Sequence, residues 1–319
     1  MFVVSGESLI DLVSKPDVNG GVLEMGAHPG GSPYNCAIAL SKLGNDTGFL
    51  CPISQDTFGD LLLGPLNAAG VHQLVAGRSP CNTTLAVVTR NAKGLPAYAF
   101  YRQGTAERDI SRDKLEKALP PAIDLFQIGG FLPIEPGDAE IWLDVVRKVA
   151  TSGAVLSIDP NVRPSLISDF DGYKDRLGQF LDLAHIVKVS DEDLAALDAG
   201  KSLEDHASDL LARPNCELVV VTKGEEGSRA FTTRAQASAP IYSPPVFGDT
   251  VGAGDSLMAG LLTAIADRNA LAPGKIGALD GLALTEILRF GAVVAGLNCA
   301  HIGCVPPTRA EVESILAQG

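Results

Sequence analysis

Short and almost continuously apolar segments recur along this chain and alternate with segments of helical periodicity. The clearest of them are Leu125–Ile128, Val155–Ile158, Ile186–Val189 and Leu218–Val221. A strand that is apolar at every position must be covered on both faces, which is typical of parallel sheets flanked by helices. The pattern therefore predicts an α/β fold with a central, mostly parallel sheet and helices on both faces.

The rest of the alternation fits the same architecture. Phe2–Val4 and Phe49–Ile53 have the composition of further strands. Gly64 and Pro65 are expected to interrupt one helix, because proline lacks an N–H donor and glycine is a poor helix former. Apolar residues at helical spacing predict helices at Pro33–Leu43, Asp56–Ala69, Ala139–Ala150, Tyr173–Ala184, Gly254–Ala266 and Leu282–Ala300.

One region breaks the alternation. Thr83–Thr89 and Ala97–Arg102 have strand composition, flank Asn91–Pro96 and have no helix between them, and Leu12–Met25 is also strand-like. We interpret these pieces as a small β-sheet lid, inserted from residues 12–33 and 81–104 into a single domain of residues 1–319. The alternative is a plain antiparallel edge on the main sheet.

Composition excludes several classes of partner. The chain is 46% hydrophobic and 20% charged, as a globular protein is, and its formal net charge of −13 offers no basic footprint for nucleic acid or anionic lipid. No apolar run reaches the ~20 residues that span a bilayer. The six cysteines form no C-x-x-C pair, and the N-terminus has no basic signal-peptide region. We expect a cytoplasmic protein with reduced thiols and no nucleic-acid or membrane partner.

The segment richest in chemical information is Val246–Leu261, VFGDTVGAGDSLMAGL. Small residues at Gly252–Gly254 lead into a helix, where unpaired N–H groups and the helix dipole favour an anion. Asp255 lies in the first turn, so its carboxylate could accept a proton beside a bound phosphate. The alternative is that Asp255 only stabilises the helix start.

Three motifs resemble the ribokinase-like (PfkB) carbohydrate kinases. Asp249–Leu262 resembles the C-terminal signature of that family, and Gly30–Asn35 (GGSPYN) resembles its Gly-Gly…Asn motif. Gly6–Asp11 (GESLID) resembles its first strand and substrate-binding aspartate. The order and spacing match along nearly the whole chain. The resemblance implies a ribokinase-like fold and an ATP-dependent transfer of phosphate to a small sugar.

The resemblance also implies roles for single residues. Asp255 would be the general base, and Gly252, Ala253 and Gly254 would form the anion hole. Sugar hydroxyls would be held by Asp11, Gly30, Gly31 and Asn35, groups that suit a polyol. Two alternatives stay open at this point: Asn35 could cap a helix start, and Asp11 could end a strand.

Further positions would hold the nucleotide and the metals. By resemblance, Thr222, Gly224, Gly227 and Asn298 belong to the nucleotide site, although a tight turn would use the same glycines. The family usually has Asn-x-x-Glu where this chain has Ser190 and Asp193, so Asp193 would act on Mg²⁺ through water or simply begin a helix. Many relatives bind a monovalent cation such as K⁺ beside the anion hole. The positions of this chain that match the ligands of that cation are Asp249, Val251, Asn298, His301 and Gly303. His301 could instead lie near the adenine or on the surface.

The substrate is indicated by two further segments. Asp159–Arg163 (DPNVR) resembles bacterial fructokinases, and Phe100–Glu107 resembles their lid segment, with Ala-Glu in place of the more common Ala-Asp. Arg102 and Arg163 would contact the sugar, or they could grip a carboxylate as in the related 2-keto-3-deoxygluconate kinases. Fructose, phosphorylated to fructose 6-phosphate, is the favoured substrate.

Several alternatives remain beside fructose. One is 2-keto-3-deoxygluconate, and another is a different sugar or a nucleoside. A non-catalytic sugar sensor would be a different class of protein, and it would be expected to lack the carboxylate at Asp255. Lid strands in this family often pair between subunits, which makes a homodimer an expectation.

Overall fold

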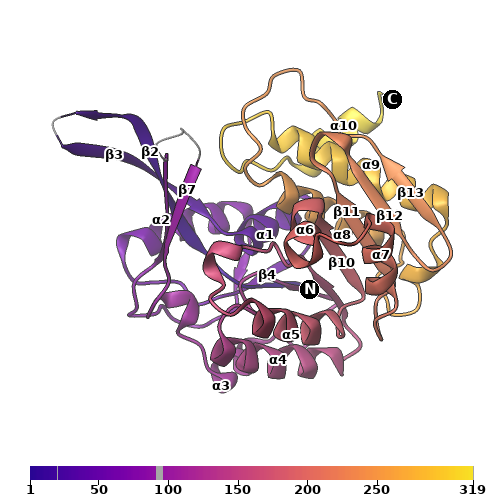
Figure 1. The fold of residues 1–319 in the computed structure, drawn as a ribbon, viewed down its shortest axis with the longest axis horizontal. Coiled ribbons are helices and arrows are strands. Elements are labelled where there is room, and N and C mark those ends of the chain that lie inside the picture. The colour runs from indigo at the N-terminus through magenta and orange to yellow at the C-terminus, as the bar shows by residue number, and fades with distance from the viewer. Residues whose placement is uncertain (20, 91–95, 319) are drawn as a thin grey trace.

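The computed structural model describes residues 1–19, 21–90 and 96–318 (Figure 1). Its main sheet has the strand order β13-β12-β11-β10-β9-β8-β1-β4-β5 among these residues. The strands are β1 Phe2–Ser5, β4 Thr47–Leu50, β5 His72–Gln73, β8 Leu125–Ile128, β9 Val155–Ile158, β10 Ile186–Ser190, β11 Leu218–Thr222, β12 Ser228–Phe231 and β13 Gln236–Ala239. Pairing is parallel from β5 to β11, and β12 and β13 add an antiparallel edge. The predicted mostly parallel sheet is confirmed.

Both faces of this sheet are covered by helices. Successive residues of β1 enter different cores, with Phe2 and Val4 on one face and Val3 on the other, as the two-residue period of a strand requires. The first face is covered by α1 Ser32–Lys42, α2 Thr57–Ala69, α8 Ala253–Asp267, α9 Gly281–Asn298 and α10 Arg309–Leu316. The second face is covered by α3 Arg112–Ala118, α4 Pro136–Ala150, α5 Phe170–Leu181, α6 Asp191–Asp198 and α7 Leu203–Leu211.

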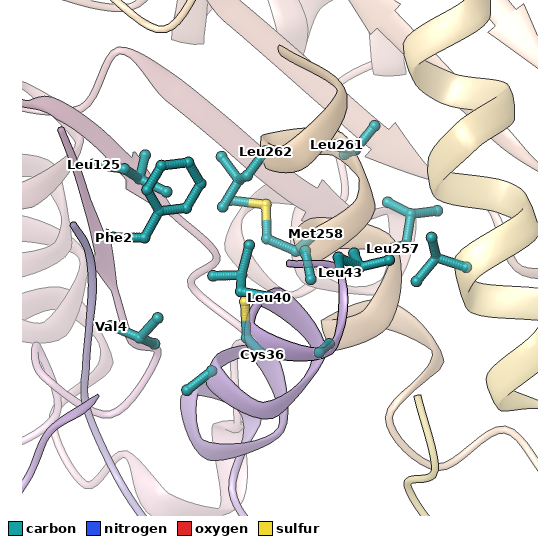
Figure 2. Packing of buried hydrophobic residues seen from close by; sticks show 14 of the residues in the cluster. Phe2, Val4, Cys36, Leu40, Leu43, Leu125, Leu257, Met258, Leu261 and Leu262 are labelled. Atoms are coloured by element: carbon teal, nitrogen blue, oxygen red, sulfur yellow. The ribbon is translucent and has the colours of Figure 1, made fainter. Parts of the chain in front are cut away.

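The first core joins α1 and α8 to the centre of the sheet. Figure 2 shows Leu40 of α1 and Met258 of α8 meeting side chains from β1 and β8, among them Phe2 and Leu125. Each of these side chains is buried. Because α1 and α8 share this core, the N-terminal ends of the two helices are held in a fixed relation.

A second, smaller sheet has the strand order β3-β2-β6-β7. Its strands are β2 Leu9–Asn19, β3 Val22–Gly30, β6 Thr84–Arg90 and β7 Pro96–Tyr101, and only the β2–β6 pair is parallel. In Figure 1 the β2–β3 hairpin projects from the body on the side opposite the C-terminus. The strand-like segments that broke the alternation thus form a sheet of their own, not an edge of the main sheet. The expected loop at residues 91–95 lies outside the described residues.

The structure differs from the sequence expectations at several elements. α2 runs through Gly64 and Pro65 without interruption, since Leu62 and Leu66 on either side are both buried and hold the helix against the core. Short helices α3, α7 and α10 were not expected, and α6 was expected only as the alternative in which Asp193 begins a helix. Four 3₁₀ turns complete the described elements: Ala106–Arg108, Pro164–Leu166, Gly224–Glu226 and Ile276–Ala278.

α8 and α9 pack unusually closely. A Cβ placed on Gly260 would lie 2.8 Å from Cα of Gly291 and 3.1 Å from Cγ2 of Val294, so only glycine fits there. α9 is also the one helix in the described part of the chain that is long and apolar enough to cross a membrane, but 56% of it is buried inside the fold. That burial marks it as a core helix.

We predict that Gly260→Ala destabilises the protein by ~1–3 kcal/mol, because the added methyl group overpacks the α8–α9 contact. The free energy of unfolding in urea measures the effect. Gly137→Ala is the matched control, since Gly137 is an exposed residue of α4, and a Cβ added to it would have nothing within 4 Å. It should stabilise by up to ~1 kcal/mol through helix propensity. Equal effects of the two substitutions would contradict the packing argument.

Candidate active site

Asp255 lies where the starts of α8 and α1 meet. Its carboxylate accepts hydrogen bonds from Ser32 Oγ at 2.6 Å and from Asn35 Nδ2 at 2.8 Å, and the residue is 9% exposed. Burial raises the pKa of Asp255, while these two hydrogen bonds and the charges of Lys188 and Arg163 oppose the rise. Ser32 was not predicted as a site residue, although its place between Gly31 and Pro33 in the motif could have indicated it.

The glycines before Asp255 shape the start of α8. Gly252 has φ +74°, and a Cβ there would overlap the Cys304 sulfur. Within the described residues, the N–H groups of Gly252 and Gly254 donate to no other group, whereas Ala253 donates to the Thr250 carbonyl at 3.1 Å. Free N–H groups at a helix start are suited to binding an anion.

A buried ion pair that the sequence analysis missed lies beside these glycines. Lys188 Nζ is 2.7 Å from Asp159 Oδ2, and both side chains are at most 7% exposed. Burial alone would lower the pKa of Lys188, but the charges of Asp159, Asp193 and Asp255 raise it above its ordinary value. Burial raises the pKa of Asp159 to about 6 despite the Lys188 charge. A lysine inside the apolar segment IVKVS was the available signal.

Asp159 and Asp255 share one cavity. Its other lining residues are Ser32, Pro33, Cys36, Gln127, Gly129 and Met258. Asp159 Oδ1 is buried and accepts no hydrogen bond from any described residue. Asp159 thus lines the same small space as Asp255 and has one carboxylate oxygen without a hydrogen-bond partner among the described residues.

Asp11 and Arg163 belong to the same neighbourhood. Burial raises the pKa of Asp11 to about 6, while the charges of His28 and Arg163 lower it and that of Asp255 raises it. Gly30 makes room for the Asp11 carboxylate, which a Cβ at Gly30 would overlap. The charges of Asp11, Arg163 and Asp255 thus act on one another, although the three residues come from distant parts of the chain.

Gly31 and Asn35 form the start of α1. Gly31 has φ +113°, and a Cβ on it would lie 2.8 Å from the Glu7 carbonyl oxygen. Only glycine suits this position. The Asn35 amide reaches Asp255 rather than capping its own helix. A cap, the alternative role for Asn35, therefore does not describe its side chain.

Arg102 is engaged in a different cluster. Its Nε donates to Glu107 Oε1 at 2.8 Å, its guanidinium carbon lies 4.6 Å from the centre of the Phe131 ring, and the residue is 9% exposed. Glu7 is also buried in this cluster and accepts the N–H of Phe131 at 3.3 Å. The contact of Arg102 with a sugar stays a prediction, and the structure adds a structural role for it.

Asp193 begins α6 and braces the neighbouring loop. Its two carboxylate oxygens accept the N–H groups of Val162 at 2.7 Å and of Ser190 at 2.9 Å, and Ser190 Oγ completes a capping box. Both the helix start and the Asp159–Arg163 segment depend on this residue. Its action on magnesium stays a prediction.

Asp249 and Asn298 hold the turn before α8 against the end of α9. Asp249 accepts the N–H groups of Val251 at 2.9 Å and Gly303 at 2.8 Å, while Asn298 donates to the Val251 carbonyl at 2.7 Å. His301 is exposed. In the described ranges, no three His, Cys, Asp or Glu side chains cluster as metal ligands. The carboxylate and carbonyl expected at a monovalent cation thus make protein hydrogen bonds, and the cation stays a prediction.

The Thr222–Gly227 segment follows β11 at the carboxyl edge of the main sheet. Gly224 is exposed with φ +51° and nothing near a Cβ position, whereas a Cβ at Gly227 would overlap the Ala239 carbonyl oxygen. Gly227 is therefore required by the β11–β12 turn. Gly224 has no such packing reason, but its positive φ by itself favours glycine, and its contact with a nucleotide stays a prediction.

Phosphate transfer to a hydroxyl needs a proton acceptor and a cradle for the phosphate charge, and Asp255 with the neighbouring amides is suited to both. The fold and this site define an α/β phosphotransferase. The family profile described as "pfkB family carbohydrate kinase" matches residues 1–311, so the chain belongs to that family.

Relatives with assigned names are similar over nearly the whole chain. Fructokinase-2 of Solanum lycopersicum is 32% identical over 330 residues, covering 100% of this chain and 97% of that protein. A fructokinase of Rhizobium leguminosarum bv. trifolii is 34% identical over 284 residues, covering 89% and 85%. The crystal structure of a Xylella fastidiosa fructokinase with bound ATP is 26% identical, with a TM-score of 0.89 and coverage of 99% and 98%.

The cluster around Arg102 predicts a pH dependence of stability. Burial, helped by the charge of Glu107, raises the pKa of Glu7 from 4.5 to about 8. Between these values the folded protein holds a proton that the unfolded chain has lost, so its stability falls as pH rises through this window. The stability of Glu7→Gln should not fall in this window, because glutamine does not titrate. Urea unfolding across the window measures it, with Glu24→Gln on exposed β3 as the control. Identical pH dependence in Glu7→Gln and the wild type would contradict the prediction.

Proposed function

We propose that this protein is an ATP-dependent fructokinase, which transfers the γ-phosphoryl group of ATP to fructose and forms fructose 6-phosphate. The observation that carries the proposal is the buried Asp255 carboxylate beside the free N–H groups of Gly252 and Gly254. The similarity to fructokinases over the full chain supports fructose as the sugar.

Asp255 is the proposed general base. As the sugar hydroxyl attacks the γ-phosphorus, its proton passes to Asp255, a new O–P bond forms, and the bond to the β-phosphate oxygen breaks to release ADP. Ser32 and Asn35 fix the carboxylate in one orientation. The N–H groups of Gly252 and Gly254, with the Ala253 position between them, face the charge that develops on the phosphoryl group.

Asp11 and Arg163 are the proposed contacts of the sugar hydroxyls, because a carboxylate can accept and a guanidinium can donate a hydrogen bond to a hydroxyl, and both charges act on Asp255. Gly30 and Gly31 let the backbone and the Asp11 side chain approach closely. The Asn35 amide oxygen is one further acceptor for a hydroxyl.

Thr222, Gly224, Gly227 and Asn298 are the proposed nucleotide site, because ligands of parallel sheets bind at the carboxyl edge. The related structure with bound ATP supports the nucleotide. Magnesium, when bound with the phosphates, would neutralise their charge, and Asp193 is the carboxylate proposed to act on it through water. A monovalent cation at Asp249, Val251 and Gly303 is an additional proposal.

The small sheet is proposed to be a lid on the sugar, within one kinase domain of residues 1–319. A lid would exclude water that otherwise hydrolyses ATP. Its strands expose Val22, Tyr98 and Tyr101, each more than half accessible, which favours pairing with a second copy in a homodimer. We also propose a cytoplasmic location, in agreement with six free thiols.

A second candidate is 2-keto-3-deoxygluconate kinase. Exposed Arg163 beside Asp11 and Asp255 is placed to bind a carboxylate of the substrate. A two-arginine clamp would also need Arg102, but Glu107 already occupies that guanidinium. This pairing favours the neutral sugar.

The test measures ADP release from MgATP with one candidate phosphate acceptor at a time. The acceptors are fructose, 2-keto-3-deoxygluconate, ribose, tagatose 6-phosphate and adenosine. Turnover with fructose at a kcat/KM far above the others is expected. Preference for the keto-acid would overturn fructose and make Arg163 the carboxylate contact. Sugar binding without turnover would indicate a sensor instead of an enzyme.

Asp255→Asn is expected to lower kcat ~100-fold or more, since the amide cannot accept the proton. The amide keeps the size of the side chain, so affinities for sugar and nucleotide, measured by calorimetry, should change little. Asp171→Asn, at an exposed position in α5, is the control. A kcat close to that of the wild type would remove Asp255 from its proposed role.

A further inference from the structure

Lys188 is a charged residue in the interior of the main sheet. Its neighbours Val187 and Val189 belong to the core under α4 and α5, so Lys188 faces the other side, where α1 and α8 lie. The parallel register pairs Val187 with Ile158, which brings Lys188 level with Asp159, the residue after β9. Their ion pair of 2.7 Å follows from this register.

This pair lies directly behind the start of α8. Lys188 Nζ is 3.1 Å from the position of a Cβ on Gly254, the residue before Asp255. Asp159 lines the same cavity as Asp255, and its Oδ1 is left without a partner among the described residues. Buried ion pairs contribute little net stability compared with apolar residues. Folding alone therefore does not explain a charged pair at this place.

Several groups act on Asp255 from the elements around it. Lys188 of β10 and Arg163 after β9 bring positive charge, while Asp11 of β2 and Asp159 bring negative charge. Ser32 and Asn35 of α1 donate hydrogen bonds. Cys36 of α1 and Cys304 after α9 are also near, but burial raises the pKa of both thiols, so they are neutral.

We propose that the Lys188–Asp159 pair sets the protonation of Asp255, with Lys188 as a positioning residue that keeps the carboxylate ionised and Asp159 as the charge that limits this effect. The inference rests on the proposed role of Asp255 as base. Burial disfavours the ionised carboxylate, and a nearby ammonium restores it. Too strong a cation would make Asp255 a poor proton acceptor, since basicity falls with the pKa. The opposite charges of Lys188 and Asp159 together allow an intermediate pKa for Asp255.

If the pair controls the protonation of Asp255, removing Lys188 and removing Asp159 should shift the pKa of Asp255 in opposite directions. A purely structural role of the pair would not predict opposite shifts. The kcat is retained above the pKa of Asp255 and lost as pH falls through it. Lys188→Met should move this acid limb to higher pH, and at pH values below the limb it should lower kcat ~10-fold for each unit by which the pKa of Asp255 rises. Asp159→Asn should move the limb to lower pH. Lys188→Arg keeps the charge and should keep the limb near its wild-type position.

Two further variants control this experiment. Lys148→Met removes an exposed ion-paired lysine of α4 and should leave the profile unchanged. Lys188→Met combined with Asp159→Asn removes the pair without leaving one buried charge, so it keeps the test open if a single variant does not fold. The double variant should still move the limb to higher pH, by less than Lys188→Met.

A measurement without substrate separates this inference from the proposed function. Carbon-13 NMR of labelled aspartate carboxyl groups follows the titration of Asp255 directly, with Asp255→Asn to assign the resonance. Opposite displacements in Lys188→Met and Asp159→Asn support the inference even if no sugar is phosphorylated. Equal or absent displacements overturn it, whatever the wild-type turnover. A wild type that turns over none of the sugars would overturn the proposed function alone.

Discussion

The central sheet must be covered on both faces, and the location of the site follows from this requirement. β1, β8, β9, β10 and β11 bury nearly every side chain, so helices occupy both sides and leave only the strand ends accessible. Ligands of parallel sheets bind at the carboxyl ends of the strands, and several polar side chains of the candidate site lie there. Asp159 follows β9, and Thr222 ends β11. Helices α1 and α8, held by the same core, bring Asn35 and Asp255 to this edge from above the sheet.

Several charged side chains lie together at that edge of the sheet, and most of them are buried. Asp11, Asp159 and Asp255 are carboxylates with raised pKa values, and Lys188 and Arg163 are the cations that face them. The buried members Asp159, Asp255 and Lys188 are costly to desolvate, and perturbed pKa values of this kind cluster at functional sites. The same cluster offers a physical reason for the proposed chemistry: a desolvated carboxylate is a stronger base than a solvated one, provided that a neighbouring cation keeps it ionised.

The fold class was predictable from sequence because apolar runs and helical periodicity are local signals. The short helices α6 and α10 could also have been found, since Ser190 and Thr308 begin capping boxes that the sequence displays. Asp255 was indicated by a motif. The lysine within the apolar segment Ile186–Val189 was a signal in the sequence, but its pairing with Asp159 could not be predicted, because it depends on the register of two strands. The Arg102–Glu107 pair depends likewise on side-chain packing around Phe131, which no local pattern encodes.

The hydrogen bonds of Asp255 join residues that lie far apart along the chain. Ser32 and Asn35 precede Asp255 by 223 and 220 positions. During synthesis, the first helix must therefore wait until most of the polypeptide has left the ribosome before its polar start meets a partner. A nascent chain that stops short of α8 lacks α8, α9 and α10, so one face of its sheet is largely uncovered and the Asp255 carboxylate is absent. The polar start of α1 thus acquires its partner only after α8 has been synthesised, and the folded site joins an early and a late segment of the chain.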